Sequence, residues 1–207
     1  LGIVGESGSG KTLSMLAVLG LLPAPLTVLG GSIQISGSPV TPATAPGMRG
    51  KRAAMVFQDP MTSLNPVFTV GAQIAEAVTL HQGLKGRAAM DAAVDALRKV
   101  QVPDPERRAK QYPHELSGGM RQRVMIAMAL ACKSEVLLAD EPTTALDVTV
   151  QAQILQLLRQ LQQETGMAIA FITHDLAVVA ELCDRVVVMY GGKVFESTDV
   201  NTLFAQP

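Results

Sequence analysis

An eight-residue motif near the start of the chain constrains the fold more than any other feature. It fits the pattern G-x-x-x-x-G-K-[ST] and consists of Gly5, Glu6, Ser7, Gly8, Ser9, Gly10, Lys11 and Thr12. The short apolar run 1–5 before it predicts a buried strand, and the apolar segment 10–22, stopped by Pro23, predicts a helix. The motif is therefore expected to join a strand to a helix, which is the context that a phosphate-binding loop requires.

The residue types of this motif suit an anion. Glycines let the backbone pass close to a phosphate with successive N–H groups pointing inward, and the positive end of the following helix adds to the attraction. We expect Lys11 to reach the β- and γ-phosphates of a nucleotide and the Thr12 hydroxyl to bind Mg²⁺. The alternative is a glycine-rich turn without a ligand, but a chance match is roughly a one per cent event in a chain of this length.

The rest of the chain alternates buried apolar strands with helices. Strands are expected at 32–37, 52–57, 136–139, 168–172 and 186–189, and helices at 69–82, 87–100, 118–131, 148–164 and after Asp175. This alternation predicts an α/β fold with a mostly parallel sheet and helices on both faces.

The two Ala-rich helices in the middle of the chain predict a small helical subdomain inserted into the α/β core. We accordingly divide the chain into a first core part (1–66), an inserted helical subdomain (67–123) and a second core part (124–207).

Composition excludes several classes of protein. With 48% hydrophobic residues among 207, the chain can build a core and is not disordered. Seventeen basic and eighteen acidic residues give a net charge of −1, and aromatic residues make up only 3%. Neither a basic surface nor a set of stacking platforms for nucleic acid is therefore expected.

Three further observations concern the environment of the chain. The longest unbroken apolar stretch, Val124–Cys132, falls far short of the roughly 20 residues needed to cross a bilayer, so no crossing is expected. Cys132 and Cys183 stand far apart and away from any histidine cluster, which predicts two buried free thiols in a reducing compartment. Because the chain opens at Leu1 and directly on a strand, we expect it to be part of a longer protein.

Two carboxylates follow the predicted strand 136–139. Ligands of open α/β sheets bind outside the carboxyl ends of the strands, which is where this pair falls. Asp140 is expected to hold Mg²⁺, and Glu141 is expected to orient or deprotonate a water that attacks the γ-phosphate. Taken alone, the pair could instead cap a helix ahead of Pro142, but the phosphate loop upstream favours the first interpretation.

Two other polar residues also end predicted strands. Gln58 follows the strand 52–57 and is expected to contact Mg²⁺ or the attacking water. His174 follows the strand 168–172 and is expected to contact the γ-phosphate. A surface glutamine and a structural histidine are the alternatives, and the pattern as a whole disfavours both.

A second glycine-rich turn opens the helix predicted at 118–131. Ser117, Gly118 and Gly119 present backbone N–H groups in the way that the phosphate loop does. The phosphate loop and this turn are both backbone anion sites, called cradles below, and one nucleotide does not need two of them on one chain. Each cradle is therefore expected to serve a different nucleotide in a head-to-tail pair of chains.

Taken together, these residues resemble the nucleotide-binding subunit of ABC transporters. The phosphate loop, Gln58, the signature turn 116–122, the acidic pair, the segment 145–147 and His174 stand in the order of that family and span nearly the whole chain. The resemblance implies a P-loop NTPase (RecA-like) fold, ATP and Mg²⁺ as ligands, and ATP hydrolysis.

The same resemblance implies a dimer with two ATP molecules between one subunit's phosphate loop and the other's Ser117-Gly118-Gly119 turn. Asp147 would lie at the dimer contact, and Gln58 would link the nucleotide to the membrane subunits. Members of the family carry strands before the phosphate loop, including an aromatic residue that stacks on adenine, and this branch continues past the core. We therefore expect N-terminal strands and a C-terminal extension outside 1–207.

A finer resemblance concerns the kind of transporter. The segments 58–66, 119–128 and 140–149 resemble the dipeptide, oligopeptide and nickel importers, and they are most similar to the first of the two paired ATPase subunits of peptide permeases. This implies a second ABC ATPase subunit in a homo- or heterodimer, two transmembrane permeases and an extracytoplasmic solute-binding protein, with no nucleic acid. The subunit would be peripheral, at the cytoplasmic face of the inner membrane, and the permease and binding protein would choose the solute.

Two alternatives to the importer remain. A soluble ABC-type ATPase of DNA repair would separate the phosphate loop from the signature by a long coiled coil, whereas only about sixty residues lie between Gln58 and Ser117. A soluble ABC-type ATPase of translation would usually carry two cassettes. An inert cassette is disfavoured because the residues of an active site are all present: Lys11, Asp140, Glu141 and His174.

Overall fold

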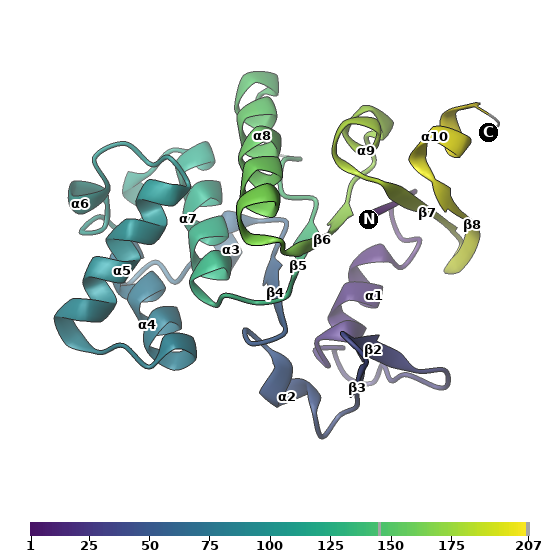
Figure 1. Ribbon diagram of the computed structural model, residues 1–207, viewed down its shortest axis with the longest axis horizontal. Helices are drawn as coiled ribbons and strands as arrows, with labels where there is room; N and C mark the ends of the chain where they lie inside the picture. Colours follow the sequence, from purple (N-terminus) through teal and green to yellow (C-terminus); the bar gives the residue numbers. More distant parts are fainter. Residues whose placement is uncertain (145, 206–207) are drawn as a thin grey trace.

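A six-stranded sheet organises the molecule, of which the computed structural model describes residues 1–144 and 146–205 (Figure 1). The strands are β1 (Gly2–Gly5), β4 (Ala53–Val56), β5 (Val136–Asp140), β6 (Ala168–Ile172), β7 (Arg185–Tyr190) and β8 (Lys193–Asp199). Their order is β4-β5-β6-β1-β7-β8, and all neighbours are parallel except β7 and β8, which are antiparallel. The predicted α/β fold with a mostly parallel sheet is confirmed.

Helices cover both faces of this sheet, as predicted. Helix α1 (Lys11–Val18) packs on one face, where Met15 shares a hydrophobic cluster with Leu138. Helices α7 (Gly118–Ala131) and α8 (Val148–Thr165) pack with Leu137 on the other face, and α9 (Leu176–Leu182) and α10 (Val200–Ala205) pack against β1 and β7. Successive residues of a strand point to opposite faces, so Leu137 and Leu138 are buried in different layers.

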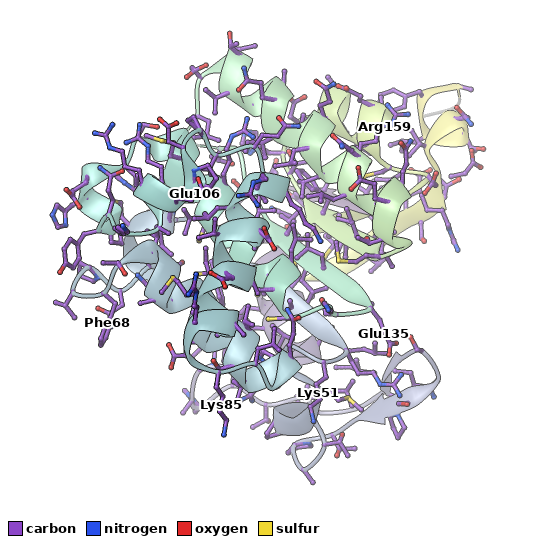
Figure 2. All side chains as sticks on the ribbon, turned by 60° about the vertical axis from the view of Figure 1, so that its left-hand side comes forward. Lys51, Phe68, Lys85, Glu106, Glu135 and Arg159 are labelled. Carbon is purple, nitrogen blue, oxygen red and sulfur yellow. The ribbon has the colours of Figure 1, made fainter. Side chains whose placement is uncertain are left out.

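Helix α8 shows how the sequence pattern produces this layer. Ile154, Leu157, Leu158 and Leu161 recur at helical spacing and are all buried against the sheet and α7. Arg159 is exposed on the solvent side (Figure 2). The apolar stripe of this helix is therefore the face that anchors it to the core.

A group of helices lies beside the β4 edge of the sheet (Figure 1). It comprises α3 (Pro60–Ser63), α4 (Val70–Gln82), α5 (Gly86–Lys99), α6 (Pro105–Arg108), the 3₁₀ turn η1 (Pro113–Glu115) and α7. One hydrophobic cluster runs from Ile74 and Leu97 in these helices to Phe171 in β6, so the group shares a core with the sheet. The division at 66/67 and 123/124 stays a prediction, and its second boundary falls within α7.

The first half of the chain differs from prediction in two places. Helix α1 ends at Val18 rather than near Leu22, because Gly20 has a φ of 62° and turns the chain out of the right-handed helix. The strand predicted at 32–37 is β2 (Ile33–Ile35), and it forms a hairpin with an unpredicted strand, β3 (Ser38–Val40), ahead of the short helix α2 (Ala45–Met48).

Two elements near the end of the described chain were not predicted. A turn at Gly191-Gly192 reverses the chain after β7 and starts β8, and helix α10 follows at once. Asp199 begins that helix by accepting a hydrogen bond from the Thr202 N–H at 2.9 Å.

The two cysteines are free, and both are half-buried rather than buried as predicted. Burial raises the pKa of the Cys132 and Cys183 thiols.

In the described ranges, none of the helices is long and apolar enough to span a membrane.

A close contact between α4 and the end of α6 generates the first prediction. A Cβ on Gly71 would lie 2.6 Å from the carbonyl oxygen of Ala109, to which the Gly71 N–H donates at 2.9 Å. We expect Gly71→Ala to lower the free energy of unfolding by about 1–3 kcal/mol in a denaturant titration, because backbone must move to admit the methyl group. Gly47→Ala is the matched control, since nothing lies within 4 Å of its Cβ position. Equal free energies of unfolding for Gly71→Ala and Gly47→Ala would contradict the close contact between Gly71 and the Ala109 carbonyl oxygen.

Candidate functional site

The phosphate-loop motif links the carboxyl end of β1 to the start of α1. Lys11 is only 6% exposed, and its Nζ donates to the carbonyl oxygens of Gly5 and Glu6 at 2.8 and 2.9 Å. These bonds hold the ammonium group against the loop backbone. A Cβ on Gly5 would lie 2.1 Å from the carbonyl oxygen of Met189, so only glycine fits between the loop and β7.

The loop has unused capacity for an anion. Ser9 is 3% exposed, and its buried Oγ has no hydrogen-bond partner among the described residues. Leaving such a group unpaired is unfavourable, and a ligand oxygen would satisfy it. Glu6 and Ser7 are exposed, and nothing lies within 4 Å of a Cβ on Gly8, so one side of the loop is open. The loop therefore fits a phosphate group.

A hydrogen bond joins the start of α1 to the end of β5. Thr12 Oγ1 donates to Asp140 Oδ1 at 3.1 Å, and Asp140 is 3% exposed. Burial raises the pKa of the Asp140 carboxyl above its usual range, with a smaller contribution in the same direction from Glu141, while the Thr12 bond and the Lys11 charge oppose the shift. A buried carboxyl and a hydroxyl beside a phosphate loop are oxygen ligands of the kind that Mg²⁺ accepts.

The three predicted catalytic residues meet at one carboxylate oxygen. Glu141 Oε2 accepts a hydrogen bond from Gln58 Nε2 at 3.3 Å and lies 3.5 Å from His174 Nδ1. The side chain of Glu141 is 17% exposed and that of His174 is 63% exposed. Gln58 was also predicted to bind Mg²⁺ with Thr12 and Asp140, but in this structure its amide donates to Glu141.

A fourth residue contacts the same oxygen and was not predicted. Thr144 Oγ1 donates to Glu141 Oε2 at 2.8 Å, and the Thr144 N–H donates to the Glu141 carbonyl oxygen at 3.3 Å. Residues 141–144 thus form a closed turn with Pro142 at its second position. A hydroxyl three residues after the acid, across a proline turn, is a sequence signal that could have found Thr144.

Helix α7, which the second cradle opens, packs on the face of the sheet opposite to α1 (Figure 1). Ser117 Oγ accepts a hydrogen bond from the Met120 N–H at 3.3 Å and so caps α7. A Cβ on Gly119 would lie 2.7 Å from Val150 Cγ1, so α7 passes very close to the start of α8. No hydrogen bond between described residues joins this turn to the phosphate loop.

Asp147, predicted at a dimer contact, begins α8. Its Oδ1 accepts a hydrogen bond from the Val150 N–H at 2.9 Å. Asp147 is exposed, and its near neighbour Ala145 lies outside the described residues.

The raised pKa of Asp140 makes stability depend on pH. The unfolded chain ionises this carboxyl more readily than the folded protein does, so stability falls as the pH rises from the ordinary value, about 3.9, through the raised one. Asp140→Asn keeps an oxygen for Thr12 and is expected to raise the Tm at neutral pH, with a gain that shrinks as the pH falls. Thermal denaturation over a pH series measures this, with the exposed Asp91→Asn as control. A lower Tm for Asp140→Asn at neutral pH would argue against the burial effect.

Comparisons with known proteins identify the family. The sequence model of the ABC transporter family matches residues 1–144, and the chain belongs to that family. Over 211 residues the chain is 56% identical to the probable peptide ABC transporter ATP-binding protein y4tR of Sinorhizobium fredii, covering 100% of this chain and 63% of the relative. Over 210 residues it is 52% identical to the dipeptide transport ATP-binding protein DppD of Escherichia coli, covering 100% of this chain and 64% of the relative.

Solved structures support the same assignment. The ATP-binding cassette MJ0796, in a dimeric post-hydrolysis state bound to ADP and Pi, superposes with a TM-score of 0.83 at 28% identity, covering 96% of this chain and 84% of that one. The cassette cbiO1 of Clostridium perfringens, part of the ABC transporter complex cbiONQ, has a TM-score of 0.82 at 28% identity, covering 99% of this chain and 78% of that one. The chain spans less than two thirds of the length of the curated relatives above.

Proposed function

We propose that this chain is the nucleotide-binding part of an ABC importer subunit that hydrolyses ATP to ADP and phosphate. The observation that carries the proposal is that Thr12 of the phosphate loop donates to Asp140, and that the next residue, Glu141, has its carboxylate contacted by Gln58 and His174. The similarity to a cassette bound to ADP and Pi supports it.

The proposed reaction needs little from the protein beyond positioning and charge. The loop backbone, Lys11 and the unpaired hydroxyl of Ser9 bind the phosphates, and His174 contacts the γ-phosphate. Glu141 accepts the proton of the attacking water, so no phosphoenzyme forms. Positioned charges in a partly buried site account for most of the rate gain in this kind of transfer.

Thr12, Asp140 and Gln58 would hold Mg²⁺, which supplies neutralising charge to the phosphates when it is bound. The buried Asp140 carboxyl and the exposed Thr12 hydroxyl fit such an ion, because Mg²⁺ commonly takes one or two carboxylates and completes its shell with phosphate and water oxygens. Among the described residues, no group of three or more His, Cys, Asp or Glu side chains is arranged to hold a metal ion by itself.

The role of Glu141 is tested by Glu141→Gln in the full-length protein assembled with its membrane partners. We expect ATP binding to persist, because the phosphate loop is untouched, and kcat to fall by at least about 100-fold, because the amide accepts no proton. Binding of a fluorescent ATP analogue and release of phosphate measure the two effects. Glu181→Gln, an exposed change in α9, is the matched control. Turnover that survives in Glu141→Gln would overturn the assignment.

We further propose that two ATPase subunits, identical or different, enclose two ATP molecules head to tail. Each phosphate loop would then face the partner's Ser117-Gly118-Gly119 turn, with Asp147 at the contact between subunits. The exposure of Ser117 and Asp147 and the dimeric state of the MJ0796 cassette support this arrangement.

Ser117→Asp tests this arrangement of two ATP molecules between two subunits, called the sandwich below, without removing the helix cap. Asp and Asn both cap helices well, but only Asp brings a negative charge towards the partner's γ-phosphate. In the full-length Glu141→Gln background, we expect Ser117→Asp to abolish ATP-dependent dimers and Ser117→Asn to keep them, as measured by light scattering after size exclusion. ATP binding to the protein's own phosphate loop should be equal in the two variants. Equal dimerisation of both would count against the sandwich.

The transported solute and the partners are part of the proposal. We propose uptake of di- or oligopeptides, with nickel as the alternative solute, through two transmembrane permeases fed by an extracytoplasmic solute-binding protein. The subunit would be peripheral, at the cytoplasmic face of the inner membrane, with 67–123 as its helical subdomain between core parts 1–66 and 124–207. The names of the relatives favour this importer over a soluble ATPase of DNA repair or translation.

A further inference from the structure

We propose that Thr144 is a positioning residue for Glu141, an inference that rests on the proposed ATPase function. Among the described residues, three groups approach Glu141 Oε2, and Thr144 Oγ1 is the nearest of them, at 2.8 Å against 3.3 Å for Gln58 and 3.5 Å for His174. Hydrogen bonds to charged acceptors are the strongest of their kind, so the hydroxyl fixes the rotation of the carboxylate.

The turn that carries Thr144 is anchored to β6 at its first residue and is closed on itself at its last. Glu141 has a φ of 44°, an uncommon conformation for a residue other than glycine, and its N–H donates to the carbonyl oxygen of Ile172 at 3.1 Å. Pro142 and Thr143 are buried, and the Thr144 N–H closes the turn on the Glu141 carbonyl. The Thr144 hydroxyl therefore holds the carboxylate from within a short, fixed segment rather than from another strand.

The other two contacts have different tasks in the proposed reaction. Gln58 is proposed to turn to Mg²⁺ and His174 to the γ-phosphate, so that both leave Glu141 Oε2. Thr144 is exposed as well, but the closed turn 141–144 keeps its backbone beside the carboxylate. The hydrogen bond from Thr144 to Glu141 Oε2 then remains when the Gln58 and His174 side chains have moved away. Thr144 thus presents Oε1, to which no described residue donates a hydrogen bond, as the oxygen that accepts the proton of the attacking water.

Thr144→Val and Thr144→Ser test this in the full-length protein assembled with its membrane partners. Valine keeps the shape and removes the hydroxyl, so we expect kcat to fall about tenfold while KM and the Kd for a fluorescent ATP analogue stay unchanged. Serine keeps the hydroxyl and should restore most of kcat. Thr27→Val, an exposed change in the loop between α1 and β2, controls for the substitution itself.

A double variant separates action through Glu141 from a general effect. In the Glu141→Gln background, adding Thr144→Val should lower the residual turnover no further, because the carboxylate that it positions is already gone. A further tenfold loss would overturn the inference, since Thr144 would then act independently of the carboxylate.

The remaining outcomes are distinguishable from failure of the proposed function. Wild-type kcat in Thr144→Val, or a lower Tm or weaker nucleotide binding that accounts for the loss, would overturn the role of Thr144 while Glu141→Gln stays inactive. Normal turnover in Glu141→Gln would overturn the proposed function and, with it, this inference.

Discussion

The parallel register of four neighbouring strands is the constraint on which the site depends. Val56 lies opposite Ala139, Asp140 lies opposite Ile172, and Ile172 lies opposite Ile3, so β4, β5, β6 and β1 end at one edge. Residues far apart in the sequence, from the phosphate loop to the histidine after β6, meet there for that reason. A shift of one residue in this register would turn every side chain of a strand to the opposite face, so the apolar core on both sides fixes the site indirectly.

The site gathers features that work against stability. Asp140 is buried with a raised pKa, Ser9 has a buried hydroxyl without a partner in the described part of the chain, and Glu141 has a positive φ. Each is unfavourable by itself and persists because the surrounding structure determines it. Their concentration at one edge of an otherwise well-packed sheet is typical of a site organised in advance for a charged ligand.

Local signals predicted most of the fold. The phosphate loop defines its own strand and helix, and the apolar stripe of α8 has the period of its buried face, so these elements follow from sequence alone. The predicted end of α1 was wrong because Gly20, rather than Pro23, breaks the helix. Strand β8 was not predicted because its residues are largely exposed and show little apolar alternation, so tertiary pairing with β7 decides it.

The candidate site was predictable as a set of residue types but not as a set of contacts. Gln58 and His174 both contact Glu141 Oε2 because of the order of the strands in the sheet. The hydrophobic periodicity of the sequence does not predict that order. The Thr144 contact was not predicted because it arises from the geometry of the four-residue turn 141–144.

The close packing of Gly119 on Val150 has a consequence for how a second subunit would meet this one. Val150 stands in the first turn of α8, which Asp147 caps, and Gly119 stands in the first turn of α7, which Ser117 caps. The absence of a side chain at Gly119 thus lets the capped starts of α7 and α8, which are distant in the sequence, pack directly against each other. A neighbouring subunit that contacted this surface would touch both helix starts together. A displacement of one start would be transmitted to the other through the contact between Gly119 and Val150.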